Sequence, residues 1–293
     1  MGYILRATAK NGDVRIFATI TTDIVQKVQT IFDLSATASA ALGRLLTAGS
    51  MMGVMLKGED DSLTLSMNGG GPAGNLVVAA NHKGFVKGYV SNPHVDLPLK
   101  ENGKLDVGGA IGRDGVLNVI KDMGLKAPYN GQSAIVSGEI GDDLAYYFTT
   151  SEQTPSAVAV GVLVDTDRSI KGAGGLIIQM MPGADELLAD IITYRLQEIP
   201  PISTLIAEGK TGEDILNLLF DDMELEIHER IETEYKCDCS RDRIERALLA
   251  LGYKELESLK EEQENIEIQC HFCDKRYTFN GEDIDRLLDE GNK

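Results

Sequence analysis

The four cysteines are the residues of this chain whose types and spacing could do chemistry. Cys237 and Cys239 form a CxC pair and Cys270 and Cys273 form a CxxC pair, all within the last quarter of the 293 residues. Four thiolates in two close pairs are what a tetrahedral Zn²⁺ site requires, because each pair spans one edge of the tetrahedron. The sequence therefore predicts one zinc ion per chain, held by these four side chains.

The chain around the cysteines predicts a small zinc-binding module, residues 236–293. Ser240 is a candidate N-cap for a helix that Gly252 can close, and a charged helix is expected over residues 254–263. Alternating apolar residues before and after the CxxC predict a hairpin with this motif at its tip; they are Ile266, Ile268, Tyr277 and Phe279. A module with so few large apolar residues usually needs a metal to fold, so metal removal should unfold it.

Two interpretations of this zinc site stay open from the residues alone. The first is a permanent structural site. The second is a redox switch, because a CxC pair can close only a small, strained disulfide ring, and strained disulfides are the labile kind. Nearby basic residues favour thiolate over thiol, although neighbouring aspartates partly offset them; the basic residues are Lys236, Arg241, Arg243, Lys275 and Arg276. Peroxide would then convert ligands to sulfenic acid and disulfides and release the zinc.

The charge of the chain is acidic and unevenly distributed. The formal net charge is −18, made up of −2 for residues 1–180, −11 for 181–235 and −5 for 236–293. Such a chain should repel phosphate backbones. This disfavours the main alternative function, a zinc ribbon that binds nucleic acid or a transcription complex. A thiol–disulfide oxidoreductase is a third possibility, but its CxxC would open a helix rather than lie between strands.

Residues 1–182 predict an α+β core domain of mixed sheet and helix. A hairpin over residues 3–8 and 14–20 turns at Asn11-Gly12, and helices are expected over residues 22–32 and from Ser35 to about Met55, the second one buried nearly all round. Short strands and one more helix, over residues 142–150, follow. The strands are expected at 62–67, 75–80, 84–90, near Leu105, and at 116–120, 133–137, 156–164 and 169–180.

Residues 183–235 predict a helical linker that is only marginally folded. An amphipathic stripe runs from Leu187 to Leu196 and ends before Pro200-Pro201, and shorter helical pieces follow up to Phe220. Apolar surface is combined here with most of the excess negative charge, so like-charge repulsion should leave the helices dependent on docking. An ordinary linker packed on the first domain is the alternative.

The sequence also predicts where the protein works and what it does not do. No apolar run approaches a membrane span and the N-terminal stretch lacks a signal-peptide core, so we expect a cytoplasmic protein whose thiols are normally reduced. Residues 1–180 contain no Ser/His/Asp or Cys/His constellation. We therefore expect neither an enzyme nor a membrane or nucleic-acid partner.

Over essentially its whole length the sequence resembles one known family, the redox-regulated holdase chaperones, which are the thirty-three-kilodalton heat-shock proteins of bacteria. The resemblance rests on the CxC and CxxC pairs together with five stretches. These are GPAGNLVV at 71–78, GKLDVG at 103–108, SGEI at 137–140, SEQTPSAV at 151–158 and QMMPGA at 179–184.

The resemblance implies an ATP-independent chaperone that is inactive while zinc is bound to reduced cysteines. Oxidation would join Cys237 to Cys239 and Cys270 to Cys273, expel zinc, unfold the C-terminal module and destabilise the linker. The active form would bind unfolding client proteins and would tend to be a homodimer. His271 lies inside the CxxC, but four thiolates already fill the site and it is assigned no role.

Overall fold

The computed structural model describes residues 1–262 and 265–291, and the last residue of the helix expected at 254–263 lies outside them. The chain divides into two compact units, Met1–Lys236 and Cys237–Lys293. Helices and strands are segregated rather than alternating, so the predicted α+β class is confirmed. Within the described ranges, no helix is both long and apolar enough to cross a membrane.

A ten-stranded sheet is the centre of the first unit, in the order β7-β6-β3-β4-β5-β10-β1-β2-β9-β8. Neighbouring strands are antiparallel except β10 and β5, which pair in parallel through two residues of each strand. The strands are β1 (Gly2–Ala9), β2 (Val14–Ile20), β3 (Ser62–Gly70), β4 (Leu76–Asn81), β5 (Phe85–Val90), β6 (Gly112–Asp122), β7 (Tyr129–Ala134), β8 (Ser156–Val164), β9 (Ile170–Met180) and β10 (Glu226–Tyr235).

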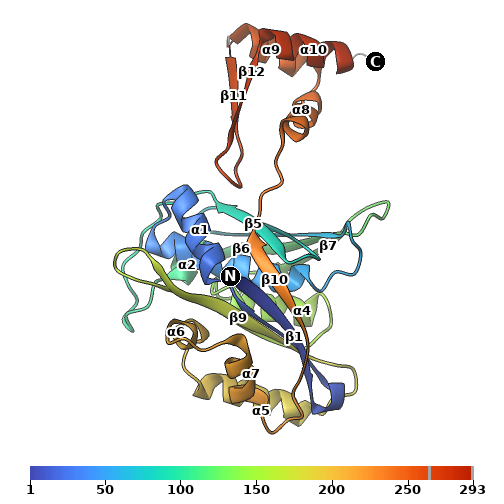
Figure 1. The fold of residues 1–293 in the computed structure, drawn as a ribbon. Coiled ribbons are helices and arrows are strands. Elements are labelled where there is room, and N and C mark those ends of the chain that lie inside the picture. The colour runs from blue at the N-terminus through green and yellow to red at the C-terminus, as the bar shows by residue number, and fades with distance from the viewer. Residues whose placement is uncertain (263–264, 292–293) are drawn as a thin grey trace. The chain divides into compact units, whose positions relative to one another are not determined.

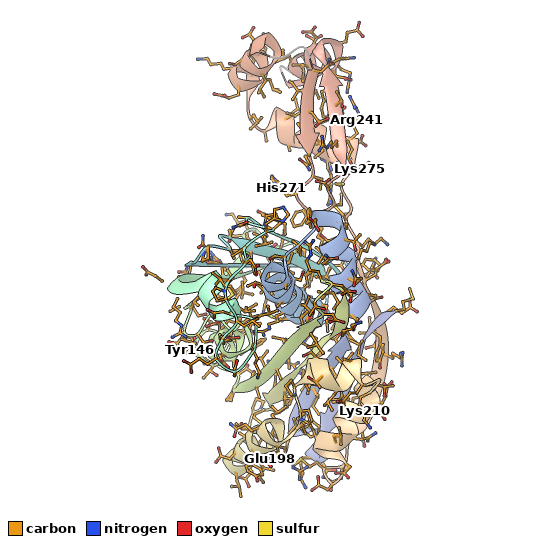
Figure 2. The ribbon with its side chains drawn as sticks, turned by 90° about the vertical axis from the view of Figure 1, so that its left-hand side faces the viewer. Tyr146, Glu198, Lys210, Arg241, His271 and Lys275 are labelled. Carbon is orange, nitrogen blue, oxygen red and sulfur yellow. The ribbon has the colours of Figure 1, made fainter. Side chains whose placement is uncertain are left out.

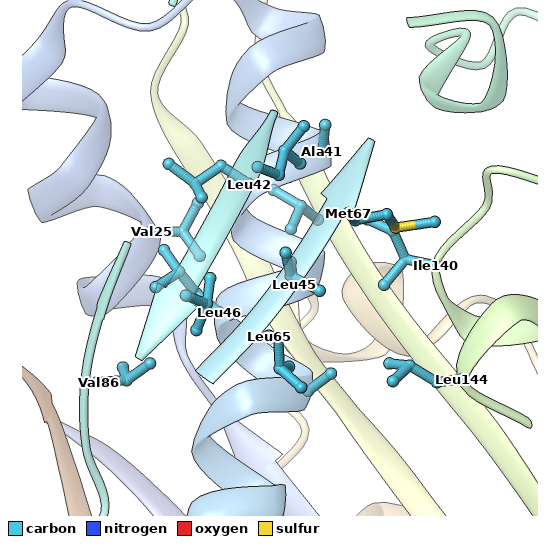
Figure 3. Packing of buried hydrophobic residues seen from close by; sticks show 14 of the residues in the cluster. Val25, Ala41, Leu42, Leu45, Leu46, Leu65, Met67, Val86, Ile140 and Leu144 are labelled. Carbon is cyan, nitrogen blue, oxygen red and sulfur yellow. The ribbon is translucent and has the colours of Figure 1, made fainter. Parts of the chain in front are cut away.

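The long apolar helix forms as predicted. Helix α1 (Thr22–Phe32) leads to α2 (Ala36–Gly53), and the hydroxyl of Ser35 caps α2 by accepting a hydrogen bond from the Ala38 N–H. Nearly every residue of α2 is buried, and its leucines contact the inward side chains of β3 to β5 (Figure 3). Helix α2 therefore covers part of one face of the sheet with apolar side chains.

One of the expected short strands is wrong and another is shifted, for local reasons. Near Leu105 the chain forms a short helix, α3 (Val107–Ile111), because the Asp106 carboxylate accepts a hydrogen bond from the Gly109 N–H and caps it. The strand expected at 133–137 ends at Ala134. Beyond it the N–H groups of Val136 and Ser137 donate to Asp143 in α4 (Gly141–Thr150), which draws the chain out of the sheet.

The opposite face of strands β1, β2 and β9 is covered by three helices. They are α5 (Glu186–Glu198), α6 (Ile202–Ala207) and α7 (Gly212–Phe220), and they lie together on one side of the sheet (Figure 1). Their apolar residues form a second buried cluster with the sheet. Glu198 and Lys210 lie at the outer surface of this layer (Figure 2).

The predicted helical linker is corrected at its C-terminal end, where the last ten residues form strand β10. The apolar residues Ile227, Ile231 and Tyr235 are spaced four apart, which resembles a helix. In the strand, Ile231 and Tyr235 pack on the same core cluster, whereas a bulge in the pairing with β1 places the partly exposed Ile227 opposite Ala7, on the other face. Strand β10 pairs along its length with β1, and Tyr235 donates its hydroxyl to the carbonyl of Gly88 in β5. The acidic linker therefore contributes a central strand to the sheet.

The second unit contains three helices and one hairpin in its described residues. They are α8 (Arg241–Leu249), α9 (Tyr253–Glu262), β11 (Asn265–Gln269), β12 (Arg276–Asn280) and α10 (Gly281–Gly291). Helix α10 was not predicted. Its apolar residues Ile284, Leu287 and Leu288 pack with Phe279 and Leu248 into a small core of the unit's own.

Candidate metal centre

The structure brings all four cysteine sulfurs together. The four Sγ atoms lie within 4.8 Å of one another, with 3.4 Å between those of Cys239 and Cys273 and 3.7 Å between those of Cys237 and Cys270. All four side chains are free thiols, with Cys270 buried and the others half-buried. His271 is not part of this group of ligand atoms.

The CxC pair lies in the short segment between β10 and α8. Ser240 ends this segment, and its hydroxyl accepts a hydrogen bond from the Arg243 N–H as the predicted N-cap of α8. The guanidinium of Arg243 also pairs with the carboxylate of Asp238, between the two cysteines. The start of α8 therefore fixes the backbone that carries Cys237 and Cys239.

The CxxC pair lies at the tip of the β11–β12 hairpin, as predicted. The Cys270 N–H donates to the Lys275 carbonyl over 2.9 Å, and the Asp274 N–H donates to the Cys270 carbonyl over 3.0 Å. Asp274 has a positive φ of 62°, a left-handed conformation that closes the tight turn. These bonds fold the knuckle so that both sulfurs point to one side.

The four sulfurs fit a tetrahedral zinc ion. A Zn–S distance of about 2.3 Å implies sulfur–sulfur edges of about 3.8 Å in a regular tetrahedron. The separations of 3.4 Å and 3.7 Å and the 4.8 Å limit bracket that value. Four thiolates with no other ligand atom in the group are the donor set of a closed zinc site rather than of an open catalytic one.

The matched proteins identify the family to which this fold and centre belong. The family model described as "Hsp33 protein" matches residues 2–280. The chain belongs to the Hsp33 family. Among its relatives, a "33 kDa chaperonin" of Clostridium perfringens is 59% identical over 99% of this chain and 92% of its own. A "33 kDa chaperonin" of Clostridium acetobutylicum is 56% identical over 99% of both chains.

A solved Hsp33 structure has the same fold. The crystal structure of the 33 kDa chaperonin (heat shock protein 33 homolog) of Thermotoga maritima superposes with a TM-score of 0.88, at 38% identity and over 98% of each chain. The predicted resemblance to the thirty-three-kilodalton heat-shock proteins is therefore confirmed. The alternative of a nucleic-acid-binding zinc ribbon receives no support from these matches.

The thiols of this Hsp33 chain differ in how readily they ionise. Burial is the largest influence at Cys237 and raises its pKa, and burial also raises the pKa of Cys273. Burial acts in the same direction at Cys239, but hydrogen bonds from Tyr277 and the other thiols outweigh it and lower the pKa of Cys239 to about 7. Without a metal, Cys239 is thus the thiol that ionises most readily of these three.

The basic residues near the sulfurs are mostly paired with carboxylates. Arg241 binds Glu245 and Asp283, Arg243 binds Asp238, Arg276 binds Glu267 and Lys236 binds Glu234. Their expected effect on the thiolates is therefore reduced, because each positive charge has a negative one beside it. The ammonium of Lys275 instead lies 5.1 Å from the ring centre of Tyr277.

One polar contact to the centre could not be read from the sequence. The hydroxyl of Tyr277, on β12, donates a hydrogen bond to the Cys239 sulfur over 3.2 Å. The alternating pattern predicted that Tyr277 is a residue of a hairpin strand, and in the structure it is buried in the module core. The pattern gave no signal for this bond, because the two residues are 38 positions apart and meet only when the hairpin folds onto the CxC segment.

Proposed function

We propose that this Hsp33-family chain is a redox-regulated, ATP-independent holdase that is inactive with zinc bound and active after oxidation. One observation carries the proposal. An apolar face of the sheet is covered by helices α5 to α7 of the acidic segment 183–235. The segment ends in β10, whose last residue, Tyr235, is two positions before the first thiol of the four-cysteine centre. A change at the sulfurs can therefore act on the cover of an apolar surface.

The reduced state holds the cover in place. We propose that Cys237, Cys239, Cys270 and Cys273 bind one Zn²⁺ per chain, which supplies folding free energy to a module with a small core of its own. Structural zinc contributes about 10–16 kcal/mol in comparable peptides at neutral pH. The folded module then fixes the chain at residue 237, immediately after the bond from the Lys236 N–H to the Val86 carbonyl over 2.9 Å.

Oxidation removes this restraint. We propose that peroxide joins Cys237 to Cys239 and Cys270 to Cys273, each disulfide forming as two thiols lose two electrons and two protons and one peroxide becomes two waters. Thiolate ligands are lost and the module unfolds. Strand β10 can then fray from its C-terminal end, where it pairs with β5 through Glu234 and Tyr235 alone.

Release of the linker would expose apolar surface on both the sheet and the linker. The sheet would present buried side chains of β1, β2 and β9, and the linker would present those of α5 to α7. Exposed apolar surface binds other exposed apolar chains and promotes association. We therefore propose that the partners are client proteins that have begun to unfold and that the active form is a homodimer. We also propose a cytoplasmic location and no enzymatic activity.

The test compares the reduced and the oxidised protein. Light scattering of heat-denatured luciferase should rise with the reduced protein and be suppressed after peroxide treatment, while a chromogenic chelator detects about one zinc released per chain. Dithiothreitol and zinc should restore the inactive form. Equal suppression before and after oxidation, or suppression without zinc release, would contradict the proposal.

A further inference from the structure

The sulfur of Cys239 accepts a hydrogen bond from a side chain outside the four cysteines. The hydroxyl of Tyr277 donates this bond over 3.2 Å. Because the donor belongs to a side chain, a substitution can remove it.

The phenol of Tyr277 is held firmly in this position. Tyr277 is 7% exposed and pairs with Ile268 across the β11–β12 hairpin. Its ring packs in the module core with Phe279, and the Lys275 ammonium lies 5.1 Å from the ring centre. A cation near the ring withdraws electron density from it, which makes the hydroxyl a better hydrogen-bond donor. The contact is therefore a built feature of the folded module.

We propose that Tyr277 is a positioning residue that slows the oxidation of Cys239 and so raises the amount of oxidant needed to open the centre. This inference rests on the proposed redox function. Groups that hydrogen-bond to metal ligands orient them and tune the metal site. Here the donor is directed at the sulfur of a half-buried cysteine.

The chemistry explains why a donor slows this step. A sulfur lone pair of Cys239 attacks one peroxide oxygen, the O–O bond breaks, and the sulfur becomes a sulfenic acid while the other oxygen leaves as water after taking up a proton. A neighbouring thiol then displaces that hydroxyl as water and forms the disulfide. The hydrogen bond from Tyr277 engages a lone pair of the Cys239 sulfur and lowers its nucleophilicity. This hydrogen bond must weaken before the sulfur can attack peroxide.

The test replaces the hydroxyl and keeps the ring. Tyr277→Phe preserves the packing with Phe279 and the cation beside the ring, and Tyr253→Phe, at an exposed tyrosine of the same module, is the matched control. The full-length, zinc-loaded proteins are treated with limiting peroxide or with iodoacetamide. Zinc release is followed with a chromogenic chelator, and labelling of each cysteine is followed by mass spectrometry.

The expected result is selective. Cys239 should be alkylated about fivefold faster in Tyr277→Phe, since a hydrogen bond to a charged group is strong enough to change a rate by this amount when partly lost in the transition state. Labelling of Cys270 and Cys273 should change by less than about twofold, and peroxide-driven zinc release should accelerate. Thermal unfolding of the module should match that of Tyr253→Phe. Equal acceleration at all four cysteines, or none, would overturn the inference.

A second variant keeps the inference testable if Tyr277→Phe folds poorly. 3-Fluorotyrosine at position 277 has the same shape and is a stronger donor, so it should slow the alkylation of Cys239. Faster or unchanged alkylation would contradict the assignment. The proposed function fails separately, because it fails if the unaltered protein keeps its zinc under peroxide. The inference about Tyr277 fails if that protein loses zinc and the variants lose it at the same rate.

Discussion

The two covered faces of the large sheet differ in what covers them. Helices α1, α2 and α4 bury side chains under one face, and Arg44 is the one charged residue of the long central helix α2. Helices α5 to α7 cover the other face with three short pieces from a segment whose net charge is −11 over residues 181–235. Both covers bury leucine side chains, so apolar contact alone does not distinguish them.

The difference lies in the charged residues that fasten each cover. On the α2 side, Arg44 and Lys100 both bind the carboxylate of Glu139, with the Arg44 contact at 2.6 Å and only 16% of its side chain exposed. On the linker side, Arg195 binds Asp222 and Arg230 binds Glu213, and these pairs are more exposed. Exposed ion pairs stabilise little. The α2 cover is therefore held by a more buried group of ion pairs than the linker cover.

Zinc removal should produce the largest difference in amide exchange between the two covers. Stripping the metal with a chelator removes a contribution of about 10–16 kcal/mol, so amide exchange in β11, β12 and α10 should become as fast as in an unfolded chain. Exchange in β10 and α5 to α7 should rise by at least about tenfold, while α2 stays protected. Hydrogen-exchange mass spectrometry measures all of these segments at once. Equal loss of protection in α2 would show that the two covers are not independent.

A matched pair of cavity-forming substitutions should distinguish a loss of folding stability from activation of the reduced protein toward clients. Leu45 of α2 and Leu216 of α7 are both fully buried, at 0% exposure. Each Leu→Ala change should cost about 2–5 kcal/mol. Leu45→Ala should lower the midpoint of urea unfolding and leave the reduced protein inactive toward clients. Leu216→Ala should loosen the linker and allow the reduced, zinc-bound protein to suppress client aggregation.

The controls for this pair are zinc content and oxidation state. Both variants should retain about one zinc per chain, which shows that activation occurs without opening the centre. Client protection by reduced Leu45→Ala equal to that by reduced Leu216→Ala would remove the functional distinction between the two faces.

The sequence predicted the features that depend on local pattern and missed those that depend on distant partners. The α2 cover was predictable because a long apolar run with a serine cap has few alternatives. Strand β10 was not, because its environment is supplied by β1 and β5, more than 130 positions away in the chain. Helix α10 could have been found from the spacing of Ile284, Leu287 and Leu288 and from Asn280, which accepts a hydrogen bond from the Asp283 N–H.

Glu139→Gln should lower the free energy of unfolding by about 2 kcal/mol at pH 7, because it weakens the ion pairs that hold the α2 cover. This is the loss expected for hydrogen bonds between charged groups. Burial opposes ionisation of Glu139, but Lys100 and Arg44 outweigh it and lower the pKa of this carboxyl. A lowered folded-state pKa stabilises the protein above the unfolded-state value, near 4.5, and this contribution is lost as the pH falls through the folded-state pKa.

Urea unfolding of the Glu139→Gln variant and of the unaltered protein should therefore differ most at pH 7. The two should converge as the pH falls from the unfolded-state value of 4.5 through the lowered folded-state pKa of Glu139, where the pairing carboxylate becomes protonated. Glu229→Gln is a suitable control, since Glu229 pairs with Arg6 at an exposed site with 49% of its side chain accessible. A constant difference in the free energy of unfolding from pH 7 to pH 3 would mean that the charge of Glu139 does not stabilise the α2 cover.

Tyr3→Phe should have the smallest effect and should act on the linker cover alone. The Tyr3 hydroxyl accepts a hydrogen bond from the Gly212 N–H and donates one to Glu213, both over 2.9 Å, and the Arg230 guanidinium lies 3.6 Å from its ring centre. Phenylalanine keeps the ring contact and removes both bonds, at a cost of about 1 kcal/mol. Because these bonds fix the first turn of α7, amide exchange there should rise and less peroxide should be needed for half-maximal client protection. Exchange in α2 should not change, so a rise in both segments would show that Tyr3 stabilises the sheet rather than the linker.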